Sequence, residues 1–301
     1  KIKLMGSPWS PPKWMKDNND TRGGSLKEEY YATYANYLVK YIKAMGDQGI
    51  PVDALTVQNE PLHPGNNPSM LFLARKEKEF IKNYLGPSFE KNNIKTKIII
   101  YDHNADRPDY PISILDDSKA AKYIDGSAFH LYGGSIDALT KVHNAHPYKN
   151  LYFTEQWIGA PGDFASDFSW HIENLIIGAP RNWCKTVLEW NLAADTNHGP
   201  HTDRGGCDSC LGAITIDGDK VIRNPAYYIV AQASKFVPPG SIRIASNIPV
   251  NLPNVAYRTP DGKIVAILQN KSEKKRNIEL KSGSLSFVTT LEAGAVGSVV
   301  F

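Results

Sequence analysis

The sequence predicts an α/β protein: a (β/α)8 TIM barrel followed by a small antiparallel β-sandwich domain. Over most of the chain, strand and helix patterns alternate at the spacing of βα units, which build a parallel sheet. No glycine-rich phosphate loop follows a predicted strand, which disfavours a doubly wound sheet. Polar side chains end nearly every predicted strand, as in barrel enzymes, where the strand ends carry the site.

The elements are expected in the following order. Predicted strands start near residues 1, 52, 97, 126, 150 and 185, and predicted helices cover 28–45, 69–89, a stretch ending at 120–124, 135–144, 167–177 and 225–236. In the first helix, apolar residues recur every three or four positions, and Gly46 and Gly49 are expected to end it. Ser69 is expected to cap the second helix. The strand 97–102 is almost continuously apolar, which is typical of a strand buried on both faces.

Six βα-type strands are fewer than a complete barrel contains. We therefore expect about two further βα units upstream of residue 1. We also expect the 301-residue segment alone to expose an open barrel edge and to aggregate.

The periodicity changes after Pro238-Pro239-Gly240. Short strand patterns separated by turn sequences follow at 255–258, 264–268, 277–280 and 284–288. Such a series predicts antiparallel strands. The expected domains are a barrel domain over 1–237 and a β-sandwich domain over 238–301.

Charge and composition restrict the class of partner. The 34 basic and 31 acidic residues leave a net charge of +3, too small to indicate nucleic acid or an anionic membrane. No run of apolar residues is long enough to predict stable membrane insertion. The substrate is therefore expected to be neutral, and the six Trp, fifteen Tyr and ten Phe suit sugar binding.

The three cysteines are Cys184, Cys207 and Cys210, and the last two form a Cys-x-x-Cys motif. His198 and His201 lie just upstream, but the spacing fits no zinc pattern well. A local disulfide is a second possibility, and plain thiols are the interpretation that we favour. No metal and no cofactor are expected.

Two glutamates stand at predicted strand ends. Glu60 follows the apolar run 52–57 within Gln58-Asn59-Glu60-Pro61, and the proline cannot continue a strand ladder. Glu155 ends the aromatic and β-branched run 151–154. Either one alone is typical of a solvated or capping glutamate, but the pair predicts a hydrolase that uses two carboxyl groups.

Other polar and aromatic side chains accompany them. The remaining candidates at strand ends are Trp9, Asn59, Asp102, His103, His130, Tyr132, Trp190 and Asn191. Aromatic rings stack on pyranose faces, and amides and imidazoles bind hydroxyls. Taken alone, His130 is more typical of a hydrogen-bonded core histidine, and Glu189 of a paired group within the barrel wall. The set predicts a sugar-binding pocket.

These motifs together resemble glycoside hydrolase family 30. They are the stretches Gly6–Ser10, Thr56–Pro61, Phe129–Tyr132, Phe153–Glu155 and Glu189–Ala193. The family contains glucosylceramidases, endo-β-1,6-glucanases and related β-glycosidases. Its motifs occur here in the family's order, over essentially the whole chain.

The resemblance implies a role for each candidate. Glu60 would be the acid/base and Glu155 the nucleophile. Asn59 would bind the sugar 2-hydroxyl and Tyr132 would contact the nucleophile. Trp9 and Trp190 would wall the first sugar subsite, with His130 and Asn191 as further substrate-binding residues.

The expected activity is that of a retaining β-glycosidase, glucosylceramidase-like, acting on β-glucosidic bonds. Glu155 is expected to raise the pKa of Glu60 and to keep it protonated as the acid. The alternatives are an endo-β-1,6-glucanase, whose branch of the family the loop 205–210 resembles more, and an inactive glycan-binding barrel. A metal-dependent hydrolase using Asp102, His103 and His130 is a third. Gln156 leaves the aglycone side open. The expected partner is glucosylceramide or a β-glucan, and that substrate class implies a secreted or periplasmic protein.

Overall fold

The computed structural model describes residues 2–301 and forms two compact units. Unit 1 contains the chain up to Thr154 together with His201–Cys207, and unit 2 contains Glu155–Pro200 and Asp208–Phe301. The expected first strand, Lys1 to Gly6, is observed only at its end, and Lys1 lies outside the described residues.

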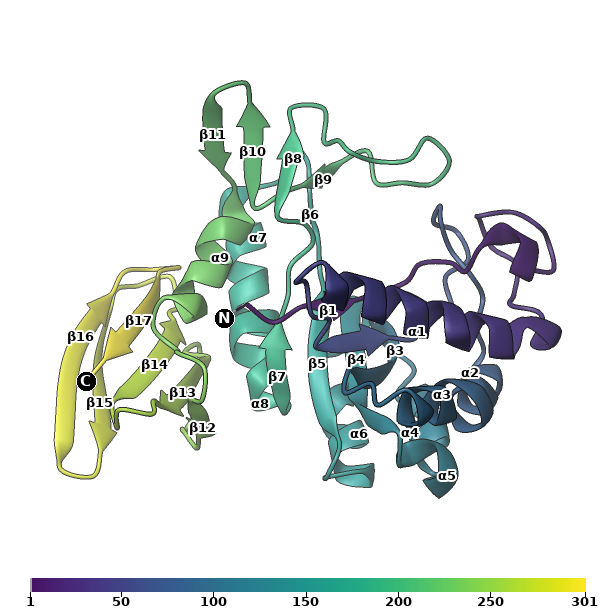
Figure 1. Cartoon of the computed structure of the whole chain (residues 1–301). Coiled ribbons are helices and arrows are strands. Elements are labelled where there is room, and N and C mark those ends of the chain that lie inside the picture. The colour runs from purple at the N-terminus through teal and green to yellow at the C-terminus, as the bar shows by residue number, and fades with distance from the viewer. Residues whose placement is uncertain (1) are drawn as a thin grey trace. The chain divides into compact units, whose positions relative to one another are not determined.

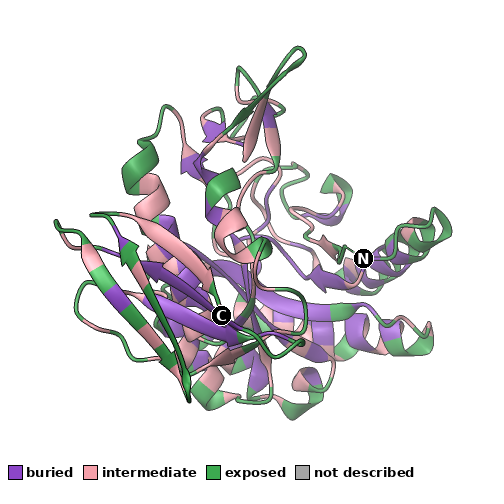
Figure 2. Ribbon diagram, turned by 90° about the vertical axis from the view of Figure 1, so that its left-hand side faces the viewer, coloured by how far each residue is buried: buried purple, intermediate pink, exposed green. Residues whose placement is uncertain are grey.

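A parallel sheet organises unit 1. Its strands lie in chain order: β1 (Met5–Gly6), β2 (Ala54–Thr56), β3 (Lys97–Ala105), β4 (Ile124–Gly134) and β5 (Asn150–Glu155). The pairs β1–β2, β2–β3 and β3–β4 are parallel, as the βα pattern predicts. One core cluster, Ala54, Ile99, Ala128 and Tyr152, takes one residue from each of four strands. The strands are largely buried in Figure 2, whereas the helices carry exposed faces.

Six α-helices belong to unit 1 (Figure 1). They are α1 (Tyr31–Asp47), α2 (Ala74–Phe80), α3 (Gly86–Lys91), α4 (Asp109–Leu115), α5 (Ser118–Ala121) and α6 (Ala138–Ala145), and a π-helical segment, Ile81–Leu85, joins α2 to α3. Helix α1 buries Tyr34, Leu38 and Ile42 of the apolar face that its periodicity predicts, whereas Tyr37 and Tyr41 are exposed. Of two expectations at the helix ends, one is wrong.

Helix α1 ends at Asp47, between Gly46 and Gly49, and Gly49 has a left-handed φ of 76°, as is common just after a helix. Ser69 does not cap the second helix, because α2 starts at Ala74 without a side-chain cap. The hydroxyl of Ser69 instead accepts a hydrogen bond of 2.8 Å from the main-chain N–H of Gly23. A capping pattern is local, and here a loop distant in sequence uses the same hydroxyl.

The end of β3 is kinked. Tyr101 and Asp102 have φ angles of 75° and 54°, in the left-handed region, and the register against β4 shifts between Tyr101 and His103. The strand is buried on both faces, and Asp102 and His103 are its first buried polar side chains. The kink therefore lies where the strand changes from apolar to polar side chains.

Unit 2 begins with the last residue of β5 and contains short strands and helices. In order they are β6 (Ile158–Gly159), α7 (Phe164–His171), the π-helical segment Ile172–Gly178, α8 (Ala179–Arg181), β7 (Cys184–Val187), β8 (Ala193–Asp195), β9 (Cys210–Leu211), β10 (Ile214–Asp217), β11 (Lys220–Arg223) and α9 (Pro225–Ser234). The expected strand 185–191 ends at Val187, and the hairpin of β10 and β11 lies in a segment for which the sequence predicted no strand.

The C-terminal strands of unit 2 are antiparallel, as expected. One sheet has the order β12 (Ile242–Ile244), β13 (Asn254–Arg258), β14 (Ile264–Gln269) and β17 (Val296–Val300). A second sheet pairs β15 (Arg276–Ser282) with β16 (Leu285–Leu291). The four strands that the sequence predicts correspond to β13, β14, β15 and β16.

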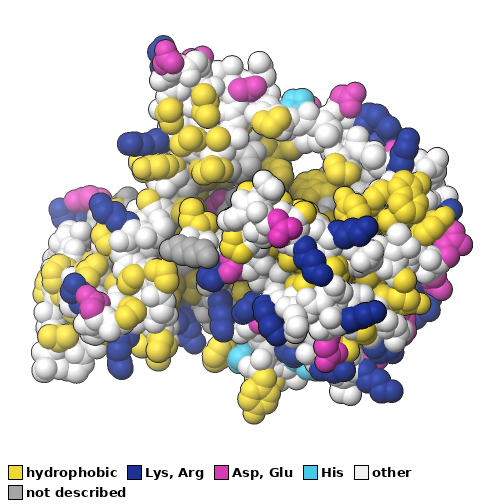
Figure 3. Space-filling view, in the orientation of Figure 1, with side chains coloured by type: hydrophobic (Ala, Val, Ile, Leu, Met, Phe, Trp, Pro, Cys, Tyr) yellow, Lys and Arg dark blue, Asp and Glu magenta, His cyan; other side chains and the backbone are white. Residues whose placement is uncertain are grey.

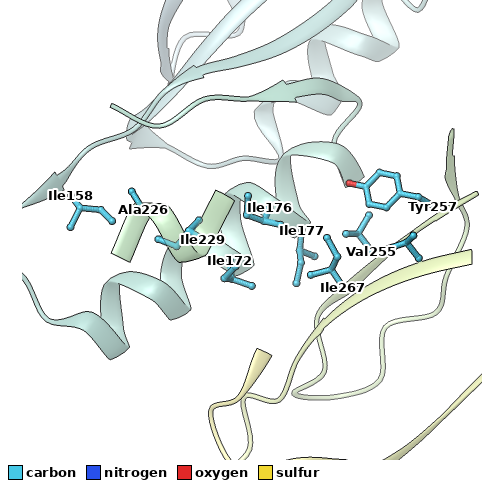
Figure 4. Close-up of a cluster of buried hydrophobic side chains, with 10 residues drawn as sticks. Ile158, Ile172, Ile176, Ile177, Ala226, Ile229, Val255, Tyr257 and Ile267 are labelled. Carbon is cyan, nitrogen blue, oxygen red and sulfur yellow. The ribbon is translucent and has the colours of Figure 1, made fainter. Parts of the chain in front are cut away.

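One of the hydrophobic cores of unit 2 joins helices to β-sandwich strands (Figure 4). It contains Ile158, Ile172, Ile176, Ile177, Ala226, Ile229, Val255, Tyr257, Val265 and Ile267. Side chains from residues 158–229 therefore pack against side chains from β13 and β14. The compact units divide at Glu155, and the expected domain boundary between 237 and 238 stays a prediction.

Surface charge is mixed on the face seen in Figure 3, where basic and acidic side chains are interspersed. This agrees with the small net charge of +3. Among residues 2–301, no helix has both the length and the apolar character needed to cross a membrane.

Candidate active site

Glu60 lies just beyond the end of β2, where its main chain is fixed on both sides. The N–H of Asn59 donates to the carbonyl of Pro8 at 2.9 Å, and the N–H of Glu60 donates to the carbonyl of Asp102, also at 2.9 Å. Glu60 has a φ of 43° and is only 6% exposed. A left-handed conformation at a non-glycine residue is a strain typical of functional sites.

A fully buried imidazole joins Glu60 to a second carboxyl group. His130, within β4, places Nδ1 3.2 Å from Glu60 Oε1 and Nε2 3.2 Å from Asp102 Oδ1. Asn66 donates from Nδ2 to Glu60 Oε2 at 2.9 Å. Both oxygens of Glu60 therefore have partners, which fixes the plane of its carboxyl group.

Asp102 is held by two hydroxyl groups as well. Ser7 Oγ donates to Oδ2 at 2.7 Å, and Thr154 Oγ1 donates to Oδ1 at 2.6 Å. Burial acts to raise the pKa of Asp102, but the hydrogen bond and charge of His130, with these hydroxyls, lower it below its ordinary value. An ionised Asp102 then orients His130 towards Glu60.

The pKa of Glu60 differs from our expectation. Burial is the largest influence and raises this pKa, but the hydrogen bond and charge of His130 are the main causes that lower it overall. We expected a raised pKa because the sequence shows a second glutamate but not the imidazole that folds against Glu60. In unit 1 the surroundings of Glu60 favour the carboxylate.

His103 is a neutral side chain next to the cluster of Glu60, His130 and Asp102. Its Nδ1 lies 4.0 Å from Glu60 Oε1, beyond hydrogen-bonding distance, and has no hydrogen-bond partner among residues 2–301. Burial lowers the pKa of His103 to about 4. At neutral pH it presents an uncharged imidazole next to Glu60.

The other predicted residues of unit 1 lie at the same end of the sheet. The ring of Tyr132 is 5.9 Å from the ring of His130, edge to face, and Tyr132 is 38% exposed. Trp9 is half-buried, and its carbonyl accepts a hydrogen bond of 2.7 Å from Gln58 Nε2. Unit 1 thus brings Glu60, His130 and Tyr132 together, with Asn59 next to Glu60 in the chain, and their roles in binding and catalysis stay predictions.

The remaining predicted residues belong to unit 2. Glu155 ends β5 and is 9% exposed. The N–H of Trp190 donates to the carbonyl of Gln156 at 2.7 Å, and the carbonyl of Asn191 accepts from Ala213 at 2.8 Å. Asn191 Oδ1 is buried without a hydrogen-bond partner in the described part of the chain, so it is available to a ligand.

Glu189 is paired, as the sequence interpretation expected. Both of its oxygens lie 3.0 Å from His171 Nδ1, and both side chains are buried. Burial raises the pKa of Glu189, and His171 opposes this effect.

Sequence reasoning missed three partners of the site. Ser7 lies within the stretch Gly6–Ser10 but was not singled out, and Thr154 was noted only as the neighbour of Glu155. Asn66 lies in a loop rich in Pro, Gly and Asn. No sequence signal identified these residues, because a hydroxyl or amide becomes a partner only through the fold.

The Cys-x-x-Cys motif differs from the interpretation that we favoured. Cys207 and Cys210 are disulfide-bonded, and Cys184 is free and buried. The disulfide therefore cross-links the end of the loop that joins β8 to β9.

Comparison with known proteins identifies the family. The profile of the Glycosyl hydrolase family 30 TIM-barrel domain matches residues 1–237. The chain belongs to glycoside hydrolase family 30. The family's beta sandwich domain matches residues 240–299, so this family 30 chain contains part of a TIM barrel followed by a C-terminal β-sandwich, which confirms the predicted fold class.

Several known proteins are similar over nearly the whole family 30 chain. An endo-1,6-beta-D-glucanase of Neurospora crassa is 37% identical over 308 residues, covering 94% of this chain and 62% of its own length. The lysosomal acid glucosylceramidase of Mus musculus is 29% identical, with coverages of 97% and 61%. Among solved structures, the endo-beta1,6-glucanase BT3312 has a TM-score of 0.92 and 35% identity, covering 99% of this chain and 70% of that one. The chain spans less than two thirds of the length of these curated relatives.

Proposed function

We propose that this chain belongs to a retaining endo-β-1,6-glucanase in which Glu60 is the acid/base and Glu155 the nucleophile. The observation that carries the proposal is the buried chain Glu60–His130–Asp102 at the end of a parallel sheet, with both links 3.2 Å long. A strand-end carboxyl group oriented in this way suits proton transfer. Membership of the family supports a glycosidic bond as the one that is broken.

The proposed reaction has two displacements. An oxygen of Glu155 attacks the anomeric carbon, the bond to the leaving oxygen breaks, and Glu60 gives its proton to that oxygen. Glu60 then takes a proton from water, whose oxygen attacks the same carbon and releases Glu155. Carboxyl groups about 5–5.5 Å apart are needed for this course, and that spacing stays a prediction.

The surroundings of Glu60 suit the second displacement. The hydrogen bond from His130 favours the carboxylate form of Glu60, which is the form that a base requires. In the free enzyme the negative charge of Glu155 opposes that effect and favours the proton that the acid step needs. Esterification of Glu155 removes this charge, so the pKa of Glu60 falls when it must act as the base.

The relatives favour a β-1,6-glucan over glucosylceramide. The glucanase of Neurospora crassa is 37% identical to this chain, whereas the mouse glucosylceramidase is 29% identical. The loop 205–210, which contains the disulfide-bonded Cys207 and Cys210, also resembles the glucanase branch in sequence. Because a β-1,6-glucan polymer does not cross a membrane unaided, we also propose that the protein is secreted or periplasmic. Cell fractionation tests this proposal.

Kinetics of two variants test the assigned roles. Glu155→Gln removes the nucleophile, so activity on every substrate should fall nearly to zero. Glu60→Ala should lose roughly 10²–10⁴-fold in kcat/KM on leaving groups that need a proton, and far less in kcat/KM on a dinitrophenyl glycoside, from which a burst of phenol should be followed by slow turnover. Added azide should rescue turnover of that substrate and yield a β-glycosyl azide. An α-azide, or equal loss on both substrates without rescue, would show that the roles are wrong.

A direct comparison of substrates tests whether the protein belongs to the glucanase or the glucosylceramidase branch of the family. A β-1,6-glucan, glucosylceramide and xylan are assayed side by side with the full-length protein, and internal cleavage is followed by product length. We expect the highest kcat/KM on the β-1,6-glucan, with oligosaccharide products. Preference for glucosylceramide would select the alternative within the family, and cleavage of xylan alone would contradict both.

A further inference from the structure

A second buried carboxyl group lies in unit 1, and the proposed chemistry does not use it. Glu77, on α2, is 1% exposed. Its Oε2 lies 2.7 Å from the hydroxyl of Tyr110 on α4, and its Oε1 has no hydrogen bond of ordinary geometry within residues 2–301. Burial of a carboxyl group costs free energy, so its retention points to something that it holds in place.

The hydrogen bonds of Tyr110 indicate which form of Glu77 is present. The Tyr110 hydroxyl also lies 2.5 Å from the carbonyl of Phe72, which can only accept. A hydroxyl has one proton, so when Tyr110 donates to Phe72, Glu77 must be protonated and donate to Tyr110. Burial, the largest influence, raises the pKa of Glu77 to about 7, so the protonated form is well populated at neutral pH.

This hydrogen-bonded chain leads to the candidate acid/base. The N–H of Phe72 donates to the carbonyl of Pro61 at 2.8 Å, and Pro61 directly follows Glu60. The loop that carries Glu60 is thereby tied, through Phe72, to the hydroxyl of Tyr110.

The same pair reaches the kinked end of β3. The main-chain N–H of Tyr101 faces the Glu77 carboxyl group and lowers its pKa. The rings of Tyr101 and Tyr110 pack with centroids 5.0 Å apart. Tyr101 is the first of the two left-handed residues of the kink, and Asp102 is the second. Support from outside the sheet is what such a strained conformation requires.

We propose that Glu77 and Tyr110 are positioning residues that hold Glu60 and Asp102 at the spacing at which His130 bridges them. The inference rests on the proposed function for its kinetic consequence. An apolar side chain could fill the same space, but it would leave Tyr110 with one partner and would no longer face the main chain of Tyr101. A misplacement of about 1 Å at a reacting group can cost about 10²-fold in rate.

The test uses the full-length protein and the variants Glu77→Leu, Glu77→Gln and Tyr110→Phe. For a β-1,6-glucan, Glu77→Leu should lower kcat by about 10–100-fold while KM changes by less than about threefold. The kcat/KM for the β-1,6-glucan should fall by a similar factor, whereas kcat/KM for a dinitrophenyl glycoside should fall much less, because it reports only the first displacement, for which this leaving group needs no acid. Glu77→Gln should retain most activity, because its amide can donate to Tyr110 as the protonated acid does. Glu79→Gln, on the same helix with a side chain 39% exposed, is the matched control.

A merely structural role predicts other results. Replacement of a buried carboxyl group by leucine is often neutral or stabilising, so a folded Glu77→Leu with unchanged kcat on both substrates would overturn the proposal. If Glu77→Leu fails to fold, Tyr110→Phe, which removes one oxygen, takes its place. It should likewise lose more activity on the β-1,6-glucan than on the dinitrophenyl glycoside.

An inactive wild-type protein would refute the proposed function without deciding the positioning role. In that case the imidazole ¹⁵N shifts of His130 decide it. They should move in Glu77→Leu and in Tyr110→Phe, and not in Glu79→Gln. Unchanged shifts in the first two variants would overturn the positioning role by itself.

Discussion

At the residue scale, the site depends on which buried groups carry charge. Burial lowers the pKa of His103 to about 4 from an ordinary 6.5, so the folded protein binds its proton more weakly than the unfolded chain does. On acidification the unfolded chain is protonated first. The stability that neutral His103 contributes is therefore complete above pH 6.5 and is lost progressively as the pH falls towards 4.

We expect this loss to reach about 3 kcal/mol in the free energy of unfolding. Glu77 acts in the opposite direction, because its raised pKa removes stability as the pH rises towards 7. The contribution of His103 is therefore isolated as a difference. In urea unfolding between pH 4 and 7, the free energy of unfolding of wild type minus that of His103→Phe should rise with pH by about 3 kcal/mol, and the exposed His201→Asn, which should follow wild type, is the control. Parallel curves for wild type and His103→Phe would contradict the expectation.

At the scale of elements, the sheet of unit 1 is closely spaced where β4 and β5 meet. A Cβ atom on Gly126 would collide with the main-chain oxygen of Asn150, whereas a Cβ atom on Gly46, inside α1, would meet no atom within 4 Å. The close approach of the two backbones therefore requires a glycine at position 126. The surroundings of position 46 would accept a side chain.

The two glycines should respond in opposite ways to alanine. Gly126→Ala forces the strands apart and should lower the free energy of unfolding by about 1–3 kcal/mol or more. Gly46→Ala should raise it by roughly 0.5–1 kcal/mol, because alanine restricts the unfolded chain and favours the helix. Urea denaturation of both variants checks the pair. An equally stable Gly126→Ala would mean that β4 and β5 are not packed as described.

At the scale of the whole molecule, the core of unit 2 decides what unfolds together. Ile229 of α9 and Ile267 of β14 belong to one buried cluster, and both are 0% exposed. Segments assigned to different domains of the family therefore depend on the same apolar contacts.

Ile267→Ala should cost about 2–5 kcal/mol, because it leaves a cavity within this shared core. Amide hydrogen exchange should show loss of protection in α9 as well as in β14. Val288→Ala, on β16 and 67% exposed, is the control and should change stability by less than about 0.5 kcal/mol. Unchanged protection of α9 in Ile267→Ala would show that the sandwich strands unfold independently.

The sequence by itself determined the architecture and the principal candidates. Alternating βα patterns predicted the parallel sheet, and a change of period after Pro238-Pro239-Gly240 predicted the antiparallel strands. Strand-end motifs identified Glu60 and His130, because an apolar run followed by a polar residue can be recognised in the local sequence.

Only the tertiary structure decided how the candidate groups interact. Ser7 and Thr154 hold Asp102 although they are 95 and 52 residues away from it in the chain. The pairing of Glu60 with His130 reversed the expected direction of the pKa shift, because a pKa depends on the groups that folding brings near, and no periodicity records them. The kink at the end of β3 is likewise unmarked, because neither Tyr101 nor Asp102 is a glycine and the contacts that hold them come from other elements.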